Sequence, residues 1–426
     1  MSERGGALRP PLRLALLAFI LSLGFMQPGF RLSGFLLVPS DLIYVPLALL
    51  ALAAATSGRL RPFWMPGFIL LIFYLAALAL AAIAADDWAR AAAKLLGQLY
   101  LVSLPVLAVW LIDDEAMLRA ALIAWLAGAA IAVSAGVAAL LLFAFAPDVP
   151  LLAPLLSGYG SLPPGDYPRL TATFRNANML CNYLTASLLI LFAARHEGWI
   201  SRAAFILFCA AALAVASFTI SPGLAGLSAG AGIWFHRMLK SRAPRIAGLL
   251  LAGSLVFASC FLLAAAVTFF PHGGAEPLFL IPHAEMRVFP SIRVLIWSEA
   301  LAGFREAPLL GRGLGTAPVD VDYLAPSGQA QSHRDAHNSF LSIASQAGLI
   351  GLAAFLALLG WAFRQAICSR PTALALGVGF AAGMGIHGLT GSFEDARHLW
   401  LLLGLFLAAL RLQRRHAGHA GRGPSG

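Results

Sequence analysis

Three titratable side chains, those of His333, Asp335 and His337, come immediately before a long apolar run that begins near Ser339. Histidine titrates near neutrality and is the side chain most often used to move a proton at physiological pH. Because the run is long enough to enter a bilayer, the spacing predicts a polar cluster at a membrane–water boundary, where an ionisable group is a candidate for function. The same residues could instead do no more than begin a helix, with Asp335 or Asn338 as its N-cap.

The composition is that of an integral membrane protein. Apolar residues make up 60% of the chain, charged residues only 11%, and the mean hydropathy of +0.82 lies far above the soluble range. The apolar runs are long and continuous, which predicts an all-α polytopic membrane protein. We attribute the net charge of +10 to basic residues that set the membrane orientation, and not to nucleic-acid binding. The four cysteines imply no disulfide framework, since three of them lie inside apolar runs.

About twelve apolar runs have a length close to that of one bilayer crossing. The seventh and eighth are separated only by Thr219-Ile-Ser-Pro-Gly223, a break that could be a tight hairpin or a kink. We expect a single transmembrane domain over residues 1–411, with the first run kept as an anchor, and a disordered cytoplasmic tail over residues 412–426. The predicted runs are 12–28, 35–55, 63–84, 92–112, 119–146, 175–194, 203–220, 223–237, 246–270, 339–363, 372–390 and 397–411.

The basic residues predict the orientation of these runs. Most Lys and Arg residues of the short loops and tails fall on the side of the N-terminus, as the positive-inside rule requires of a cytoplasmic N-terminus. An even number of crossings then places the C-terminus inside as well. Two long loops, at about 147–174 and 271–338, are expected on the periplasmic face, and the second ends in the His337 cluster.

The second long loop has the pattern of an amphipathic helix lying along the outer surface. Within residues 291–305, one helical face carries Arg293, Trp297, Leu301 and Phe304. The helix should end at Ala307-Pro308, and Gly311-Arg-Gly-Leu-Gly315 should then form a tight turn. No strand precedes these glycines, so they match neither a dinucleotide fingerprint nor a phosphate loop.

Several segments in this order resemble the signature region of the O-antigen ligase family, which includes lipopolysaccharide O-antigen ligases and related surface-glycan polymerases. They cover most of residues 170–411, while the first five runs match only in hydropathy and order. One departure stands out, because the family often carries Ser-Arg-Gly where this chain has Ser221-Pro222-Gly223. The segments are Arg293, Trp297, Phe304, Pro308 and Gly311-Arg-Gly-Leu-Gly315, then His337-Asn-Ser-Phe-Leu, Gln346-Ala-Gly-Leu-Ile-Gly351, Thr173-Phe-Arg-Asn-Ala-Asn178, Cys181-Asn-Tyr-Leu and Glu394-Asp-Ala-Arg-His-Leu-Trp400.

The resemblance implies a GT-C-like membrane glycosyltransferase of the bacterial inner membrane. Its donor would be a glycan on undecaprenyl diphosphate, and its acceptor a sugar hydroxyl of lipid A core or of a second lipid-linked repeat. His337 would take the proton from the acceptor hydroxyl. A repeat-unit polymerase of O-antigen or exopolysaccharide would have the same architecture and is the alternative.

The diphosphate leaving group needs positive charge, which a metal or fixed guanidinium groups can provide. No carboxylate-rich metal motif is present on the outer side, so we expect arginines in place of a metal, and no cofactor. Arg175 or Arg169 would replace the family's missing arginine. The candidate donor-binding residues are Arg293, Arg175 and Arg312, and weaker candidates for substrate contact are Arg169, His333, Asp335, Asn338 and Asp395.

Each of these residues also has a less specific interpretation. His333, Asp335 and His337 could hold a metal ion, with His272 or His283 as a further ligand. Arg293 could extend to lipid headgroups, and Arg312 could be a surface arginine. The remaining polar residues could serve packing alone, with Asp395 and Arg397 as a local ion pair, Asp41 bonded inside the bundle and His387 packed between helices.

Two other classes of protein remain compatible with the sequence. A transporter of lipid-linked glycans could have as many helices, but its ionisable residues would be expected near the bilayer midplane rather than at one surface. A non-catalytic scaffold of a glycan-assembly complex would not need His337. Neither the sugars nor the acceptor can be read from the sequence.

Overall fold

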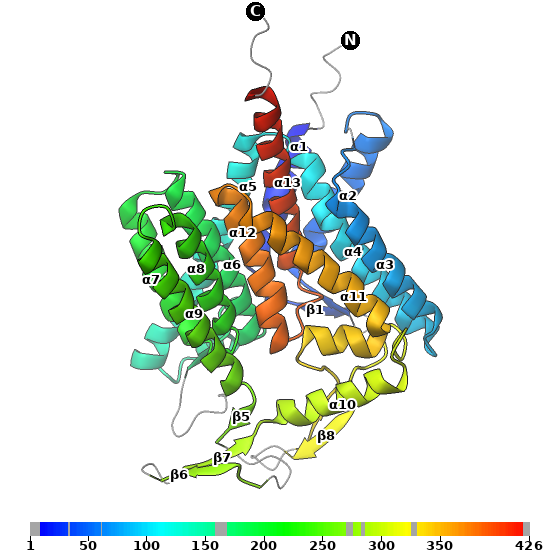
Figure 1. Ribbon diagram of the computed structural model, residues 1–426, viewed down its shortest axis with the longest axis vertical. Helices are drawn as coiled ribbons and strands as arrows, with labels where there is room; N and C mark the ends of the chain where they lie inside the picture. The colour runs from blue at the N-terminus through cyan, green and yellow to red at the C-terminus, as the bar shows by residue number, and fades with distance from the viewer. Residues whose placement is uncertain are drawn as a thin grey trace, which may run out of the picture.

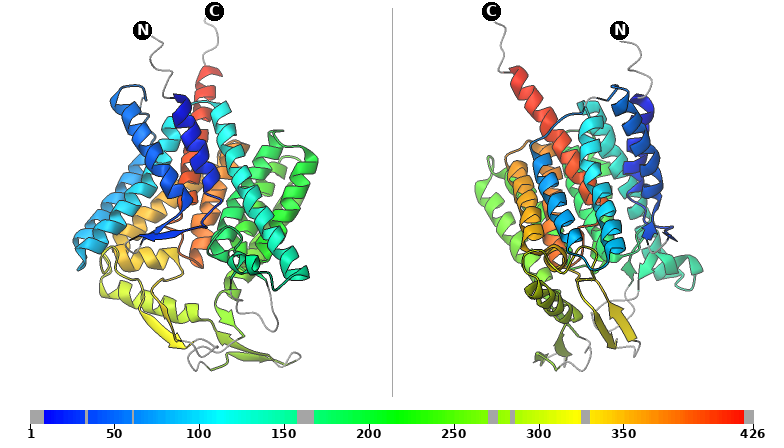
Figure 2. Two further views of the ribbon diagram at one scale, coloured as in Figure 1. Left: turned by 180° about the vertical axis from the view of Figure 1, so that it is seen from behind. Right: turned by 90° about the vertical axis from the view of Figure 1, so that its right-hand side faces the viewer.

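The structure is a computed structural model that describes residues 9–32, 35–60, 62–157, 168–269, 276–282, 286–324 and 330–420. Helices run along a bundle whose two chain ends lie at the same end (Figures 1 and 2). The described α-helices are α1 (Arg9–Ser22), α2 (Pro39–Thr56), α3 (Gly67–Ile83), α4 (Trp88–Leu111), α5 (Glu115–Phe145), α6 (Ala177–His196), α7 (Arg202–Ser217), α8 (Leu224–Leu239), α9 (Pro244–Ala264), α10 (Ile292–Glu306), α11 (Ser339–Ile367), α12 (Pro371–Ala381) and α13 (Arg397–Ala420).

The short strands lie in the connections between helices and form small antiparallel sheets. The strands are β1 (Phe30–Leu32), β2 (Phe35–Leu37), β3 (Leu156–Ser157), β4 (Arg169–Leu170), β5 (Val267–Thr268), β6 (Phe279–Ile281), β7 (Met286–Pro290), β8 (Val321–Leu324) and β9 (Ala330–His333). The sheets pair β1 with β2, β3 with β4, β5 and β6 with β7, and β8 with β9. Three further short helical segments are η1 (Pro150–Leu155), η2 (Ala382–Ile386) and η3 (His387–Leu389).

Helix α13 lies at the centre of the bundle. It contacts α4, α5 and α12, and nearly every side chain from Leu399 to Leu410 is buried. A helix that is apolar on all sides is stable only when other helices surround it. Gly404 lets α13 approach α4 closely, because a Cβ there would lie 2.7 Å from the Cα of Pro105.

Seven described helices are long and apolar enough to cross a membrane: α2, α4, α5, α6, α9, α11 and α12 with its continuation to Leu389. An α-helix lies at each of the twelve predicted runs, and α10 is the additional one. The chain is therefore an all-α polytopic membrane protein, as the composition predicted. The number of crossings stays a prediction, as do the domain limits.

A helix and a glycine turn are present where the sequence predicted them, while the position of the helix at the outer membrane surface stays a prediction. Helix α10 begins after Ser291 and ends before Ala307, and in the figures it lies beyond the end of the bundle that is opposite the two termini (Figure 1). Its buried side consists of Ile296, Ala300 and Gly303, with Trp297 partly buried beside them. All three glycines between Gly311 and Gly315 have positive φ angles. Only glycine adopts such angles without strain.

Helix α11 departs from the prediction of one continuous span. Its backbone is not helical at Gly348, where φ is 61° and ψ is −161°. The chain from Pro308 to Gly311 passes through this break, and the backbone N–H of Leu349 donates to the carbonyl of Pro308 at 2.8 Å. A side chain at Gly348 would overlap the carbonyl of Leu309. The first segment of α11 is therefore a short helix that ends where the outer loop crosses it.

The structure also decides between a hairpin and a kink at Pro222, and it places the end of the last helix later than expected. The break around Pro222 is a turn between two separate helices, α7 and α8, and Ile220 in it has a φ of 48°. Helix α13 continues to Ala420, so residues 412–420, expected in a disordered tail, are helical. Leu412 is buried against the core and continues the packed face of α13, which explains the extension. Residues 421–426 lie outside the described part of the chain.

The orientation of the bundle can be tested with single cysteines at two exposed positions. We expect Ser298→Cys on α10 to react with an impermeant thiol reagent in intact spheroplasts, and Ser241→Cys between α8 and α9 to react only after lysis. The background should lack Cys181, Cys209, Cys260 and Cys368, which are all free. Labelling of Ser241→Cys in intact spheroplasts would reverse the orientation.

Candidate active site

His337 lies in a constrained turn directly before α11. Its φ is 46°, a left-handed conformation that is unusual for a residue with a side chain and is often found at functional sites. The Asp335 carboxylate accepts the backbone N–H of His337 at 2.9 Å, and its other oxygen lies 3.7 Å from Nδ1 of the ring. Asp335 also accepts a hydrogen bond from the Ser392 hydroxyl. The hydrogen bonds fix the backbone of His337 and the Asp335 carboxylate, and the ring lies with Nδ1 on the Asp335 side.

Asn338 is the N-cap of α11, and not Asp335. Its side-chain oxygen accepts the backbone N–H groups of Phe340 and Leu341 at 3.0 and 3.1 Å. Its side-chain nitrogen donates to the carbonyl of Leu389 at 3.2 Å. The amide is thus committed to holding the start of α11 against the end of η3, so the expected substrate contact of Asn338 has no structural support.

Two arginines from distant segments face His337. Arg293 belongs to the first turn of α10, and Arg169 to β4, yet the positive charges of both lower the pKa of His337. Burial is the largest cause of that lowered pKa, and the Asp335 carboxylate opposes it. The imidazole is therefore neutral at pH 7, which is the form that a general base requires.

Arg293 is half-buried, and no described residue forms an ion pair with it. Burial, and then repulsion by Arg169, lower the pKa of Arg293 to about 10. One terminal nitrogen donates weakly to the carbonyl of Ala265 at 3.4 Å. Its Nε and the indole Nε1 of Trp297, one helical turn later, are buried donors without an acceptor among the described residues. Buried donors of this kind need an explanation, and an anionic or hydroxyl-rich ligand would supply acceptors.

Arg169 is held against the turn that follows α7. Its Nε donates to the carbonyl of Thr219 at 3.1 Å, and a terminal nitrogen donates to the side chain of Asn178 at 3.3 Å. Burial lowers the pKa of Arg169. The guanidinium thus lies beside the segment where this chain has Pro222, although the two residues are far apart in the sequence.

The other two arginines have different surroundings. Arg175 is exposed in the turn before α6. Arg312 donates to the carbonyls of Ala317 and Pro318 at 3.1 and 3.0 Å, and its guanidinium lies against Gly303 of α10. Arg312 therefore holds α10 and the glycine turn together. Its Nε is a buried donor without an acceptor among the described residues, so donor binding by Arg312 stays a prediction.

His333 lies next to His337 at the end of β9. Their ring centroids are 5.4 Å apart and the rings meet edge to face. Burial and the charge of His337 lower the pKa of His333. His333, Asp335 and His337 do not form a metal-binding group, and no set of three or more His, Cys, Asp or Glu residues does so in the described ranges. His272 and His283, considered as further ligands, lie outside those ranges.

Asp395 and Arg397 do not form the local ion pair considered from the sequence. Asp395 pairs with Lys94 and accepts from Gln98 at 2.6 Å, both on α4. Arg397 binds Asp41 at 2.5 and 2.8 Å in a two-pronged contact. Asp395 thus joins the start of α13 to α4, and its side chain has that structural role instead of the expected substrate contact.

The smaller expectations for Asp41 and His387 are confirmed. The carboxylate of Asp41 is bonded inside the bundle to Arg397 and to the Tyr100 hydroxyl. His387 is fully buried, donates to or accepts from the Thr185 hydroxyl at 2.9 Å, and packs against Gly223 and Gly226.

Glu394 was assigned no role from the sequence. It is buried, and one of its oxygens accepts from the Ser342 hydroxyl at 2.6 Å. Its other oxygen has no partner among the described residues. Burial, and then the neighbouring Asp395, raise the pKa of the Glu394 carboxyl well above its usual range. A glutamate placed between Phe393 and the last apolar run was a visible signal, since a charge there must find partners.

Comparison with known families agrees with this geometry. Residues 200–356 match the family model described as O-antigen ligase. This match over part of the chain supports an O-antigen ligase assignment. The matched part contains α10 with Arg293 and the segment from His333 to His337, whereas Arg169 and Glu394 lie outside it. No curated protein matches the chain. The O-antigen ligase assignment confirms the resemblance and supports a multi-pass membrane protein that transfers glycans as a ligase or polymerase.

The charge of Arg293 should affect the pKa of His337, and this effect can be measured without an activity assay. Removing this positive charge in Arg293→Gln should raise the pKa of His337, so that the neutral ring appears only at higher pH. The pH dependence of acylation of His337 by diethyl pyrocarbonate, followed by mass spectrometry, measures this change. Arg293→Lys keeps the charge and should stay near the wild type, with His236 as an internal control. Identical profiles for Arg293→Gln and wild type would contradict the arrangement.

Proposed function

We propose that the protein transfers a glycan from an undecaprenyl-diphosphate donor to a sugar hydroxyl at the periplasmic face of the bacterial inner membrane. The observation that carries the proposal is that His337, in its constrained turn beside Asp335, lies close enough to the half-buried Arg293 and Arg169 for their charges to lower its pKa. His337 supplies the base, while Arg293 and Arg169 supply positive charge without a metal. A repeat-unit polymerase would perform the same chemistry on a lipid-linked acceptor and is the alternative.

The reaction follows from what each group can do. Nε2 of His337 accepts the proton of the acceptor hydroxyl while the hydroxyl oxygen bonds to the anomeric carbon. The bond from that carbon to the phosphate oxygen breaks, and undecaprenyl diphosphate leaves with the electron pair. Guanidinium groups stabilise the charge that develops on the leaving diphosphate. A single displacement of this kind inverts the anomeric carbon.

The two arginines and Trp297 are suited to different parts of the donor. Arg293 presents a buried Nε without a protein acceptor, which favours a phosphate oxygen in that place. The Nε1 donor of Trp297 lies one turn along α10 and could bond the second phosphate or the first sugar. Arg169 comes from another segment, β4, and would supply a second positive charge to the diphosphate.

Arg169 is a better candidate than Arg175 for replacing the arginine that the family often has after its seventh helix. Its guanidinium lies at the carbonyl of Thr219, three residues before Pro222, and it acts on the pKa of His337. Arg175 is exposed, which makes strong donor binding by it less favourable. The replacement thus comes from another loop rather than from the same turn.

His337→Ala should slow transfer by roughly a hundredfold to ten-thousandfold, the usual range for loss of a general base. Purified protein would be given the lipid-linked donor and either acceptor in buffer containing EDTA, and the glycan product would be measured. The acid limb of the wild-type pH–rate curve should lie below pH 6.5, because burial and the arginines lower the pKa of His337. His333→Ala is the matched control and should be much milder.

Three results of this experiment would contradict the proposal. Normal turnover by His337→Ala would remove its role as base. Loss of turnover caused only by failure to bind donor would place His337 in the diphosphate site instead. Loss of wild-type activity in EDTA, restored by magnesium or manganese, would show that a metal rather than arginine balances the diphosphate charge.

Arg169→Ala should weaken donor binding more than Arg175→Ala. Loss of one hydrogen bond to a charged group costs about 1.5–3 kcal/mol, which is roughly ten- to a hundredfold in affinity. Binding of labelled donor to the purified variants measures the difference, and thermal unfolding checks that Arg169→Ala still folds without its bond to Thr219. A larger loss in Arg175→Ala would reverse the assignment of the two arginines.

A further inference from the structure

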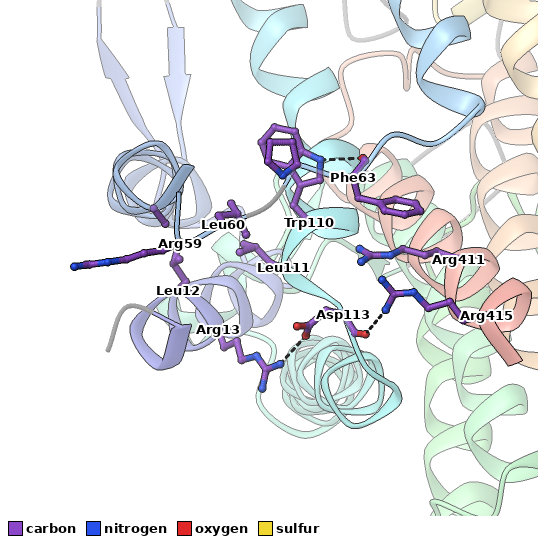
Figure 3. A pocket seen from close by; sticks show the side chains of 12 residues that line it. Leu12, Arg13, Arg59, Leu60, Phe63, Trp110, Leu111, Asp113, Arg411 and Arg415 are labelled. Atoms are coloured by element: carbon purple, nitrogen blue, oxygen red, sulfur yellow. Dashed lines mark hydrogen bonds and ion pairs between the residues drawn. The ribbon is translucent and has the colours of Figure 1, made fainter. Parts of the chain in front are cut away.

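A second basic cavity lies at the end of the bundle that carries both termini, opposite His337. Its volume is about 430 Å³, and it is lined by the start of α1, the connection from α2 to α3, the end of α4 and the last turns of α13 (Figure 3). Four of its lining residues are arginines, Arg13, Arg59, Arg411 and Arg415, whereas Asp113 is the only acidic one. The glycan-transfer site does not account for this concentration of charge.

The arginines of the cavity differ in how they are compensated. Arg13 is neutralised, because it binds Asp113 at 2.6 Å and Asp114 at 2.8 Å. Arg59 is exposed, and its side chain points away from the others (Figure 3). The other two arginines of the cavity are Arg411 and Arg415, and Figure 3 shows both extending from α13 toward its centre.

Both arginines of α13 donate to main-chain carbonyls rather than to carboxylates. Arg411 bonds the carbonyl of Val109 at 2.6 Å, and Arg415 bonds that of Asp113 at 3.1 Å. The Nε of Arg411 is buried and has no acceptor among the described residues. Their guanidinium groups also lie 4.1 and 5.9 Å from the ring centre of Phe63, which holds them side by side. Two adjacent cations with donors to spare favour an anion with several oxygens, such as a phosphate.

The remaining walls of the cavity are apolar. They include Leu12, Leu60 and Leu111, with the indole of Trp110 fixed by its bond to the carbonyl of Phe63 at 3.1 Å. Tryptophan is enriched where membrane helices reach the headgroup level, and here α1 begins and α4 ends. A phosphate held by arginine beside apolar walls at this level is the chemistry of a lipid headgroup with its acyl chains.

We propose that this cavity binds the phosphate of an anionic phospholipid from the membrane leaflet on the side of the termini. Arg411 and Arg415 hold the phosphate oxygens, while Leu60, Leu111 and Trp110 contact the glycerol and the first part of the acyl chains. Because α13 runs through the core of the bundle, a lipid bound to its last turns fastens the central helix to α1 and α4. The binding is independent of glycan transfer.

The test uses the full chain in neutral detergent, with phosphatidylglycerol or phosphatidylcholine of the same acyl chains added. Lipid adducts are counted by native mass spectrometry, and thermal unfolding is measured in parallel. Phosphatidylglycerol should bind in preference and raise the unfolding temperature, since a ligand that binds only the folded state stabilises it. Arg415→Gln should weaken this binding about fivefold, the effect of one arginine near an anionic headgroup.

Arg414→Gln is the matched control, since Arg414 is the neighbouring exposed arginine of α13 and does not line the cavity. It should bind phosphatidylglycerol as the wild type does, and Arg415→Lys should lose less than Arg415→Gln. Equal losses in Arg414→Gln and Arg415→Gln would overturn the proposal, as would equal binding of the two lipids. If sodium phosphate alone gives the same stabilisation, the cavity holds a soluble anion and the lipid assignment is wrong.

Discussion

The packing of the segment from Pro308 to Gly311 against the break in α11 at Gly348 is the constraint on which the candidate site depends. At Gly348 the helix opens, and the backbone N–H groups of Leu349 and Ile350 turn to the carbonyls of Pro308 and Leu309 at 2.8 and 3.3 Å. The N–H of Arg312 then donates to the carbonyl of Ser345 at 2.8 Å. An open helix inside a membrane protein must satisfy its backbone groups with other protein, and here the outer loop does so. The loop is therefore fixed to the bundle by main-chain bonds.

That attachment sets the distance between α10 and the start of α11, and hence between Arg293 and His337. Arg312 strengthens it, because its guanidinium binds the carbonyls of Ala317 and Pro318 while lying against Gly303 of α10. At its other end α10 is tied to α9 through Ser291, whose hydroxyl donates to the carbonyl of Ala265 at 2.8 Å. A helix held at both ends can keep a buried arginine close to another cation, which repulsion would otherwise separate.

The sequence predicted the features that depend on neighbouring residues. The limits of α10 followed from its periodicity and Pro308, the glycine turn from three glycines, and the cap of α11 from the presence of Asn338. The sequence could not separate Asn338 from Asp335 as the cap, because both are good capping residues and only the backbone geometry decides. The break at Gly348 was missed, since a single glycine in an apolar run is compatible with a continuous helix.

Local sequence patterns could not predict the contacts between distant segments. Lys94 pairs with Asp395, Arg397 with Asp41, and Arg169 reaches Thr219, each across many residues and several helices. The local pair of Asp395 and Arg397 was an incorrect reading for this reason, because two charges close in sequence found stronger partners on α4 and α2. In a membrane bundle each charge near a helix end must find a partner wherever the fold brings one.

The two ends of the bundle use arginine in different ways, and burial explains the difference. Near the termini, Arg13 is matched by two carboxylates, so its charge mainly joins α1 to the start of α5. At the candidate site, Arg293 is half-buried and repelled by Arg169; burial first, and then the positive charge of neighbouring arginines, lower the pKa of Arg293 and of His337. Bringing two like charges together away from water costs stability in the free protein. An incoming diphosphate would remove that cost, so binding of the donor and relief of repulsion are the same event. Under the proposed function, neutralising the arginine charge would let the pKa of His337 rise toward its ordinary value, so the imidazole would be a stronger base with the donor bound.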